Sequence, residues 1–259
     1  RKKQLSKVIY QKDLGTLLTQ TNNIKNISVL IAKINNIDVN HVKQAAQFSK
    51  CDLITGMVSE FPELQGVMGH HYAKSEGYEK ETCLAIKEQY QPRFSGDNIP
   101  KSQAGKALAC ADKINTISGI FSIDKKPSGT SDPFGLRRSA IGIIRICIEG
   151  EIIFSINTII STALKLHKTP KKDIPRICHD IEEFLLNRMK TYFVNTRGFN
   201  ANLLDAVQSN NLDSFIDYEK RIIAMDSFLS LNESVYLAEA AKRTNNILRK
   251  VKYDSNISV

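Results

Sequence analysis

Apolar residues recur at three- and four-residue steps along most of this chain, and no convincing run alternates between apolar and polar positions. A step of three to four residues places side chains on one face of an α-helix, whereas a strand buried on one side shows a period of two. Glycine and proline then divide the pattern into separate helices. The sequence therefore predicts an all-α fold.

The first helix that the pattern delimits covers residues 38–61. Asp38 is a suitable N-cap because its short carboxylate can accept hydrogen bonds from the first free amides of a helix. Pro62 should end the helix, since proline is poorly tolerated inside one. The apolar positions at helical steps are Val42, Ala46, Phe48, Leu53, Met57, Val58 and Phe61.

Four further helices are expected before residue 168. The third of them opens with Asp132 as N-cap and Pro133 at the first helical position, a combination favoured at helix starts. Loops that carry proline and glycine, at 91–101 and 124–131, separate these helices. The four helices are expected at residues 79–90, 102–120, 133–149 and 155–167.

Beyond residue 168 the pattern changes to long amphipathic helices, so we expect a domain boundary near 168–176. The two predicted domains are residues 1–170 and 171–259. Because the chain starts with arginine and its second part ends abruptly in a basic helix and a polar tail, we expect a piece of a longer protein with a truncated second domain. The later helices are expected at residues 177–193, 203–210, 213–231 and 234–252.

Composition favours a folded, soluble, cytoplasmic protein, with 42% apolar and 24% charged residues. The longest apolar run, at 141–148, is broken by Gly142 and Arg145 and falls short of the roughly 18 apolar residues of a membrane span. Five cysteines, with no CxxC pair among them, are typical of reduced thiols in the cytosol.

A formal net charge of +9 suits a polyanionic partner, although a generic solvated surface would also explain it. Arg137 and Arg138 follow a loop of hydroxyl-bearing residues, and an arginine fork can bind phosphate through two hydrogen bonds. They could equally pair with Glu60 or Asp112. The basic face at the end of the chain is either solvated or binds RNA. The candidate phosphate contacts are Lys126, Arg137, Arg138, Lys242, Arg243 and Arg249.

Catalytic chemistry finds little support, and no residue is predicted to be catalytic. Neither a glycine-rich phosphate loop nor a GxSxG elbow occurs. His70 and His71 are adjacent and would point about 100° apart on a helix, so they could not easily share a metal ion. Among the acids, Asp112 and Glu60 could form ion pairs or be relics of a metal site. No metal is therefore expected.

Several long motifs resemble the β-subunit family of bacterial heterotetrameric glycyl-tRNA synthetases. Residues 52–73 read Asp-Leu-x-Thr-x-Met-Val-x-Glu-Phe-Pro-Glu-Leu-Gln-Gly-x-Met-Gly-x-x-Tyr-Ala. The two long motifs are specific because each combines residues of opposing structural preference. Further segments match the family as well, and the resemblance covers nearly the whole chain. These segments are residues 88–97, 111–113 with 119–121, 132–138 and 241–248.

The resemblance implies an HD-like helical domain over about 1–170, followed by the N-terminal part of a helical-bundle anticodon-binding domain. It also implies a role for the chain in positioning tRNA(Gly) for ATP-dependent glycylation in the active site of an α subunit within an α2β2 assembly. ATP and Mg are expected at that α subunit, so no cofactor is expected on this chain. The HD-like domain would descend from metal phosphohydrolases, but the paired histidines are missing, and Asp112 alone stands as a candidate relic.

Two other classes of function stay open at this point. A working HD-type phosphohydrolase would cleave nucleotides or RNA 3′ ends with a divalent metal. A structural scaffold would instead dock residues 52–72 and 127–145 against neighbouring domains or the α subunit, leaving an apolar patch exposed on the isolated chain.

Overall fold

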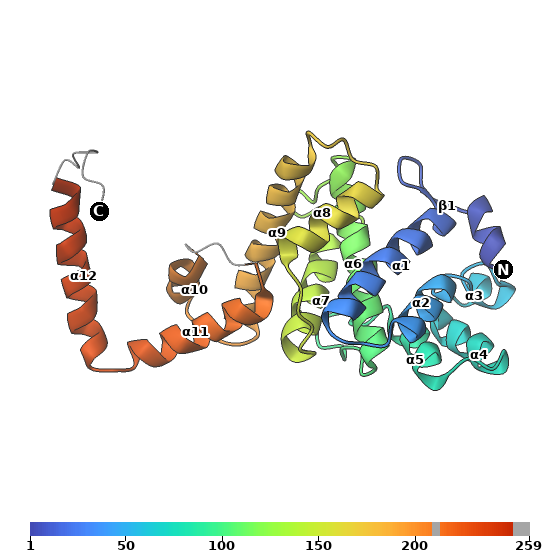
Figure 1. The fold of residues 1–259 in the computed structure, drawn as a ribbon, viewed down its shortest axis with the longest axis horizontal. Helices are drawn as coiled ribbons and strands as arrows, with labels where there is room; N and C mark the ends of the chain where they lie inside the picture. The colour runs from blue at the N-terminus through green and yellow to red at the C-terminus, as the bar shows by residue number, and fades with distance from the viewer. Residues whose placement is uncertain (209–212, 251–259) are drawn as a thin grey trace.

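A computed structural model describes residues 1–208 and 213–250. It is built almost entirely of helices (Figure 1), which confirms the predicted all-α class. Within the described residues the exception is a small antiparallel hairpin of β1 (Ile9–Gln11) and β2 (Gly15–Thr16) near the start of the chain. No helix in this part of the chain is long and apolar enough to cross a membrane.

The helices follow one another with short connections, and some are single turns. The 3-10 helices are η1 (Lys2–Lys7) and η2 (Pro62–Leu64). The α-helices of the first part are α1 (Leu17–Ile34), α2 (Val39–Phe48), α3 (Gly56–Glu60), α4 (Val67–Ser75), α5 (Lys80–Glu88), α6 (Gln103–Ser122), α7 (Leu136–Glu149) and α8 (Ile156–Leu166). Those that follow are α9 (Ile174–Asn195), α10 (Ala201–Gln208), α11 (Phe215–Leu229) and α12 (Glu233–Lys250).

The core is organised around α6, which packs against α1, α5, α7 and α8. Ser102 caps this helix, its hydroxyl accepting a hydrogen bond from the Gly105 amide at 3.0 Å. Alanines line much of the buried surface of the helix and let its neighbours approach closely. The fully buried alanines of α6 are Ala104, Ala107, Ala109 and Ala111.

Helix α1 was missed by the sequence pattern, which delimited no helix before residue 38. Its buried face carries Ile24, Ile27 and Ile31, but also the polar Gln20 and Asn23. Gln20 is satisfied across the core, donating to the Leu14 carbonyl at 2.8 Å and accepting from the Asn115 amide at 2.7 Å. Buried polar residues with distant partners therefore concealed the apolar face of α1.

The single helix predicted for residues 38–61 is wrong, because the chain forms α2 and α3 with a turn between them. The N-cap prediction is confirmed, since the Asp38 carboxylate accepts hydrogen bonds from two amides at the start of α2. Thr55 caps α3 in the same manner. A tertiary contact that local spacing does not reveal stabilises the turn. The side-chain amide of Gln89 donates a hydrogen bond of 2.6 Å to the Ser49 carbonyl.

The predicted start of α7 is also wrong, because the helix begins at Leu136 rather than Pro133. Gly135 precedes it with a φ of 65°, a left-handed conformation that favours glycine. Asp132, which precedes the helix, nevertheless provides acceptors for the free amides of its first turn. Its carboxylate accepts hydrogen bonds from the Leu136 and Arg137 amides at 2.8 and 2.9 Å. The capping residue was identified correctly, and its position relative to the helix was not.

Helices on the two sides of the predicted domain boundary share one buried cluster. Helix α9 packs against α7 and α8, and α11 reaches α7. Figure 1 shows α12 at the end of the molecule, away from the N-terminal helices, where it contacts α11. The boundary near 168–176 stays a prediction. The predicted ends of two helices, at residues 209–210 and 251–252, lie outside the described residues.

Candidate nucleic-acid interface

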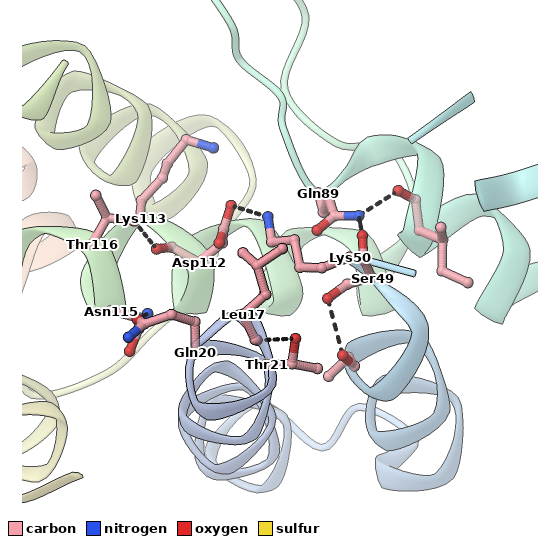
Figure 2. Close-up of polar contacts among 12 residues, drawn as sticks. Leu17, Gln20, Thr21, Ser49, Lys50, Gln89, Asp112, Lys113, Asn115 and Thr116 are labelled. Atoms are coloured by element: carbon pink, nitrogen blue, oxygen red, sulfur yellow. Dashed lines mark hydrogen bonds and ion pairs between the residues drawn. The ribbon is translucent and has the colours of Figure 1, made fainter. Parts of the chain in front are cut away.

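The predicted acid Asp112 lies on α6 and forms a buried ion pair with Lys50, which follows α2. Their atoms Oδ2 and Nζ are 3.1 Å apart, and Figure 2 shows the two side chains facing each other. The Lys50 ammonium also lies 4.2 Å from the centre of the Tyr90 ring. Burial opposes the charge on Lys50, but the attraction of Asp112 and Tyr90 outweighs it and raises the pKa of this lysine. Burial raises the pKa of Tyr90 to about 12.

Asp52 has a structural role that sequence reasoning missed, although it opens the long motif at 52–73. Its side chain is buried, and its Oδ2 accepts hydrogen bonds from the Gly66 amide at 2.6 Å and the Gly69 amide at 3.1 Å. These amides belong to the start of α4, where a carboxylate is favoured by the helix dipole. A Cβ atom at Gly69 would lie 3.1 Å from the same oxygen and 2.7 Å from the Ile86 side chain. The glycines of the motif therefore leave the space that the Asp52 side chain occupies.

The residues of this region do not fit a divalent metal. No group of three His, Cys, Asp or Glu side chains in the described ranges could hold one. Asp112 is committed to Lys50, and the bonded oxygen of Asp52 faces backbone amides. Glu60 is exposed at the end of α3 with no ion-pair partner among the described residues. His70 is hydrogen-bonded to the Cys83 carbonyl at 2.9 Å, so it too has a local role.

Lys126, the first of the predicted phosphate contacts, is already neutralised. Its Nζ lies 2.6 Å from Oδ2 of Asp180 on α9 and 3.9 Å from Asp124. His179, which precedes Asp180, is exposed and lies 3.7 Å from Glu183. Asp180 therefore holds the 124–131 loop against α9, and a phosphate would have to compete with it for Lys126.

Arg137 and Arg138 are paired with neither Glu60 nor Asp112. Arg137 donates to the Gly129 carbonyl at 2.6 Å, which ties the preceding loop to α7. Arg138 is exposed and has no carboxylate partner within the described ranges. Of the two, Arg138 is thus the more available to a ligand.

Both arginines line an open pocket of about 390 Å³ between α7, α9 and the loop at 92–96. Arg145 and Arg188 line it as well, and sequence reasoning assigned neither of them a role. Their signal was partly present, because Arg138 and Arg145 are seven residues apart, two helical turns, and share a face of α7. The contribution of Arg188 from α9 could not be read from local spacing. Four arginines thus line one pocket.

Lys113 lies between the ion pair and the pocket. It follows Asp112 on α6, yet Figure 2 draws no contact between its amine and that carboxylate. Its Nζ donates to the Gln91 carbonyl at 2.7 Å, and its Cε lies 2.7 Å from where a Cβ of the pocket residue Gly142 would stand. Burial lowers the pKa of Lys113 to about 8, and the attraction of Asp112 offsets that shift only partly.

The remaining predicted contacts are on α12, which lies far from α7 (Figure 1). Lys242 and Arg243 are exposed and have no carboxylate partner in the described part of the chain. Nothing is described of the Arg249 side chain, so that prediction lies outside the described residues. The predicted contacts therefore occupy two separate places rather than one continuous site.

Comparisons with known proteins agree on one family. A family profile described as "Glycyl-tRNA synthetase beta subunit" matches residues 1–209. Curated relatives named "Glycine--tRNA ligase beta subunit" include those of Chromohalobacter salexigens (39% identical over 262 residues, covering 100% of this chain and 37% of the relative) and Photorhabdus laumondii (40% over 256 residues, covering 99% and 37%). The chain spans just over a third of the length of these relatives.

Proposed function

The chain belongs to the glycyl-tRNA synthetase beta-subunit family, and from this premise we propose that it supplies part of the tRNA-binding surface of a glycine–tRNA ligase. In this proposal it positions tRNA(Gly) for ATP-dependent glycylation at the active site of an alpha subunit, in an α2β2 assembly in the cytoplasm. ATP and Mg bind at the alpha subunit. The segment itself holds the RNA and carries out no chemical step.

One observation carries the proposal: exposed cations without carboxylate partners occur at the start of α7 and on α12. Arg138, Lys242 and Arg243 meet this description within the described residues. Unpaired surface cations attract phosphate and release counterions when they bind it. The excess of basic residues, +9 over the chain, adds a favourable long-range field.

Lys126 and Asp112 are removed from the set of candidate RNA contacts. Both belong to internal ion pairs, so they support the fold rather than the RNA. Phosphate contacts would position the RNA, whereas discrimination between tRNAs requires contact with unpaired or terminal nucleotides. We therefore assign the electrostatic contribution to Arg138 and the α12 cations.

The test is a titration of the chain with tRNA(Gly) and with one unrelated tRNA across a salt series. A steep fall of log affinity with log salt, together with preference for tRNA(Gly), is the expected result. A steep fall without preference would mean that this segment supplies only charge. Absence of binding at low salt would overturn the proposal and favour a scaffold role.

The assembled alpha and beta subunits provide the second measurement. Charge-removing substitutions at Arg138, Lys242 and Arg243 should raise the KM for tRNA in the glycylation reaction and leave the KM for ATP unchanged. Equal effects on both constants would contradict a role confined to the RNA.

A further inference from the structure

The pocket between α7 and α9 has the dimensions of a ligand site. Its volume of about 390 Å³ lies within the range of about 300–1,000 Å³ that is typical of small-molecule sites. Pro92, Ile141 and Gly142 give it an apolar lining, whereas its charged groups are arginines and a single acid, Glu149. Its composition therefore suits an anion that also carries an apolar face.

The arginines of the pocket are not equally engaged. Arg145 forms an ion pair with Glu149 through two hydrogen bonds of 2.7 and 2.9 Å. It donates a third hydrogen bond, of 2.8 Å, to the Asp97 carbonyl. Arg137 donates to the Gly129 carbonyl. The one acid of the pocket is thus neutralised by its own helix, and Arg138 and Arg188 have no carboxylate partner among the described residues.

Arg188 gives the strongest indication of a missing partner. Its Nε is buried and has no hydrogen-bond acceptor in the described part of the chain. An unpaired buried donor on a charged group is costly, and such groups occur where a ligand supplies the acceptor. Arg188 also lines the pocket, where a bound phosphate would accept hydrogen bonds from its planar guanidinium fork.

Phe94 supplies the apolar counterpart at the same pocket. Phe94 is 62% exposed, although hydrogen bonds fix its loop. The Asp97 carboxylate accepts from the Arg93 amide at 2.7 Å, and Arg145 holds the Asp97 carbonyl. An aromatic ring presented beside a phosphate-binding group is the arrangement on which unstacked bases of single-stranded RNA rest.

We propose that this pocket takes a single unstacked nucleotide of a bound RNA, with its phosphate on Arg138 and Arg188 and its base against Phe94. The inference rests on the proposed RNA-binding function and deepens it. A paired duplex cannot supply a free base face, so the pocket selects a single-stranded or everted nucleotide. It thereby adds a structural preference to the purely electrostatic contacts of α12.

The experiment measures the affinity of the chain for tRNA(Gly), for a ten-nucleotide single-stranded RNA and for the same sequence as a full duplex. The pocket variants are Arg188→Gln and Phe94→Ala, and the matched control is Lys43→Gln, which removes one exposed charge from α2. Phe94→Ala should weaken single-strand binding about 5- to 100-fold, because stacking contributes on that scale. Arg188→Gln should weaken it about tenfold, and Lys43→Gln by less than about twofold.

Duplex binding should change by less than about twofold in both pocket variants. Equal loss for duplex and single strand would overturn the proposal, as would an effect of Arg188→Gln no larger than that of Lys43→Gln. If tRNA(Gly) still binds with a steep salt dependence while neither pocket variant has an effect, the pocket assignment fails and the proposed function stands. If no RNA binds to the unmodified chain, both fail.

A free nucleotide is the other source of the same chemistry. AMP and inorganic phosphate are therefore titrated separately, with a Phe94→Ala comparison. Weak AMP binding, at least tenfold weaker than that of the single strand, is the expected result. Tight AMP binding that depends on Phe94, together with unchanged RNA binding in the variant, would assign the pocket to a free nucleotide and overturn the proposal.

Discussion

Two charged regions of this molecule, the ion pair at α6 and the pocket between α7 and α9, differ in how their charges are satisfied. In the ion pair of Lys50 and Asp112, each charge has a partner, and both side chains are largely removed from water. In the pocket lined by Arg138, Arg145 and Arg188, the donors outnumber the acceptors and the pocket is open. The first arrangement is complete within the protein, whereas the second requires an external anion. A charged residue thus reveals its role through its partners rather than through its type.

The largest effect is expected from Lys50→Met, which leaves Asp112 buried without a counter-charge. The free energy of unfolding should fall by about 3–5 kcal/mol, as is usual when one member of a buried pair is removed. Urea denaturation measures the loss. Arg138→Met, which removes a charge from the pocket, should change the same quantity by less than about 0.5 kcal/mol.

A double variant tests whether the Lys50 effect comes from the unpaired charge. Lys50→Met combined with Asp112→Leu should recover part of the lost stability, because no charge is then left buried. A double variant less stable than the sum of its single variants would show that the pair does not act as a unit.

The next largest effect is expected from Asp52→Ala, which leaves the buried amides of Gly66 and Gly69 without an acceptor. An unsatisfied buried donor costs about 1–3 kcal/mol, and because the two amides share one acceptor oxygen their costs are not fully additive, so a loss of about 2–4 kcal/mol is expected by thermal or urea unfolding. Asp52→Asn retains a side-chain oxygen and serves as the matched control. If Asn and Ala cost the same, the hydrogen bonds to α4 are not the cause.

The buried amine of Lys113, between the two regions, should make the free energy of unfolding depend on pH. Its folded-state pKa is lowered by burial to about 8, whereas an unfolded lysine titrates at about 10.4. Below pH 8 both states hold the proton and the penalty of the buried charge is fully present. Between pH 8 and 10 only the unfolded state holds it, so raising the pH favours the folded state.

The measurement compares the unfolding free energies of the unmodified chain and Lys113→Met from pH 7 to 10. Their difference should shift by about 1–3 kcal/mol in favour of the unmodified chain as the pH rises. Lys43→Met, which alters an exposed lysine, is the matched control. A flat difference for Lys113→Met would contradict the lowered pKa.

The smallest effect on stability is expected on α12, outside both regions. Arg243→Ala should leave the unfolding free energy within about 0.5 kcal/mol, because the side chain is exposed and unpaired within the described residues. It should weaken tRNA binding and reduce the salt slope by about one unit if it contacts a phosphate. A slope that does not change would remove Arg243 from the interface.

Local signals predicted much of the helical architecture but failed where tertiary partners intervene. Asp38 was readable as a cap because a capping side chain acts on backbone amides within three residues of itself. Helix α1 was missed because Gln20 is buried against partners that are distant in sequence. The break between α2 and α3 depends on Gln89, forty positions beyond the Ser49 carbonyl that it contacts.

The sequence by itself determined the all-α class, most helix positions, the capping residues Asp38 and Asp132 and, through its long motifs, the family. These follow from interactions between neighbours along the chain or from residue order itself. Only the tertiary structure decided which charges are available, because pairing depends on proximity in space. In the folded chain Asp112 and Lys126 form ion pairs, and Arg188 on α9 lines the same pocket as Arg138 on α7. A charge that looks free in the sequence is free only when folding brings no partner to it.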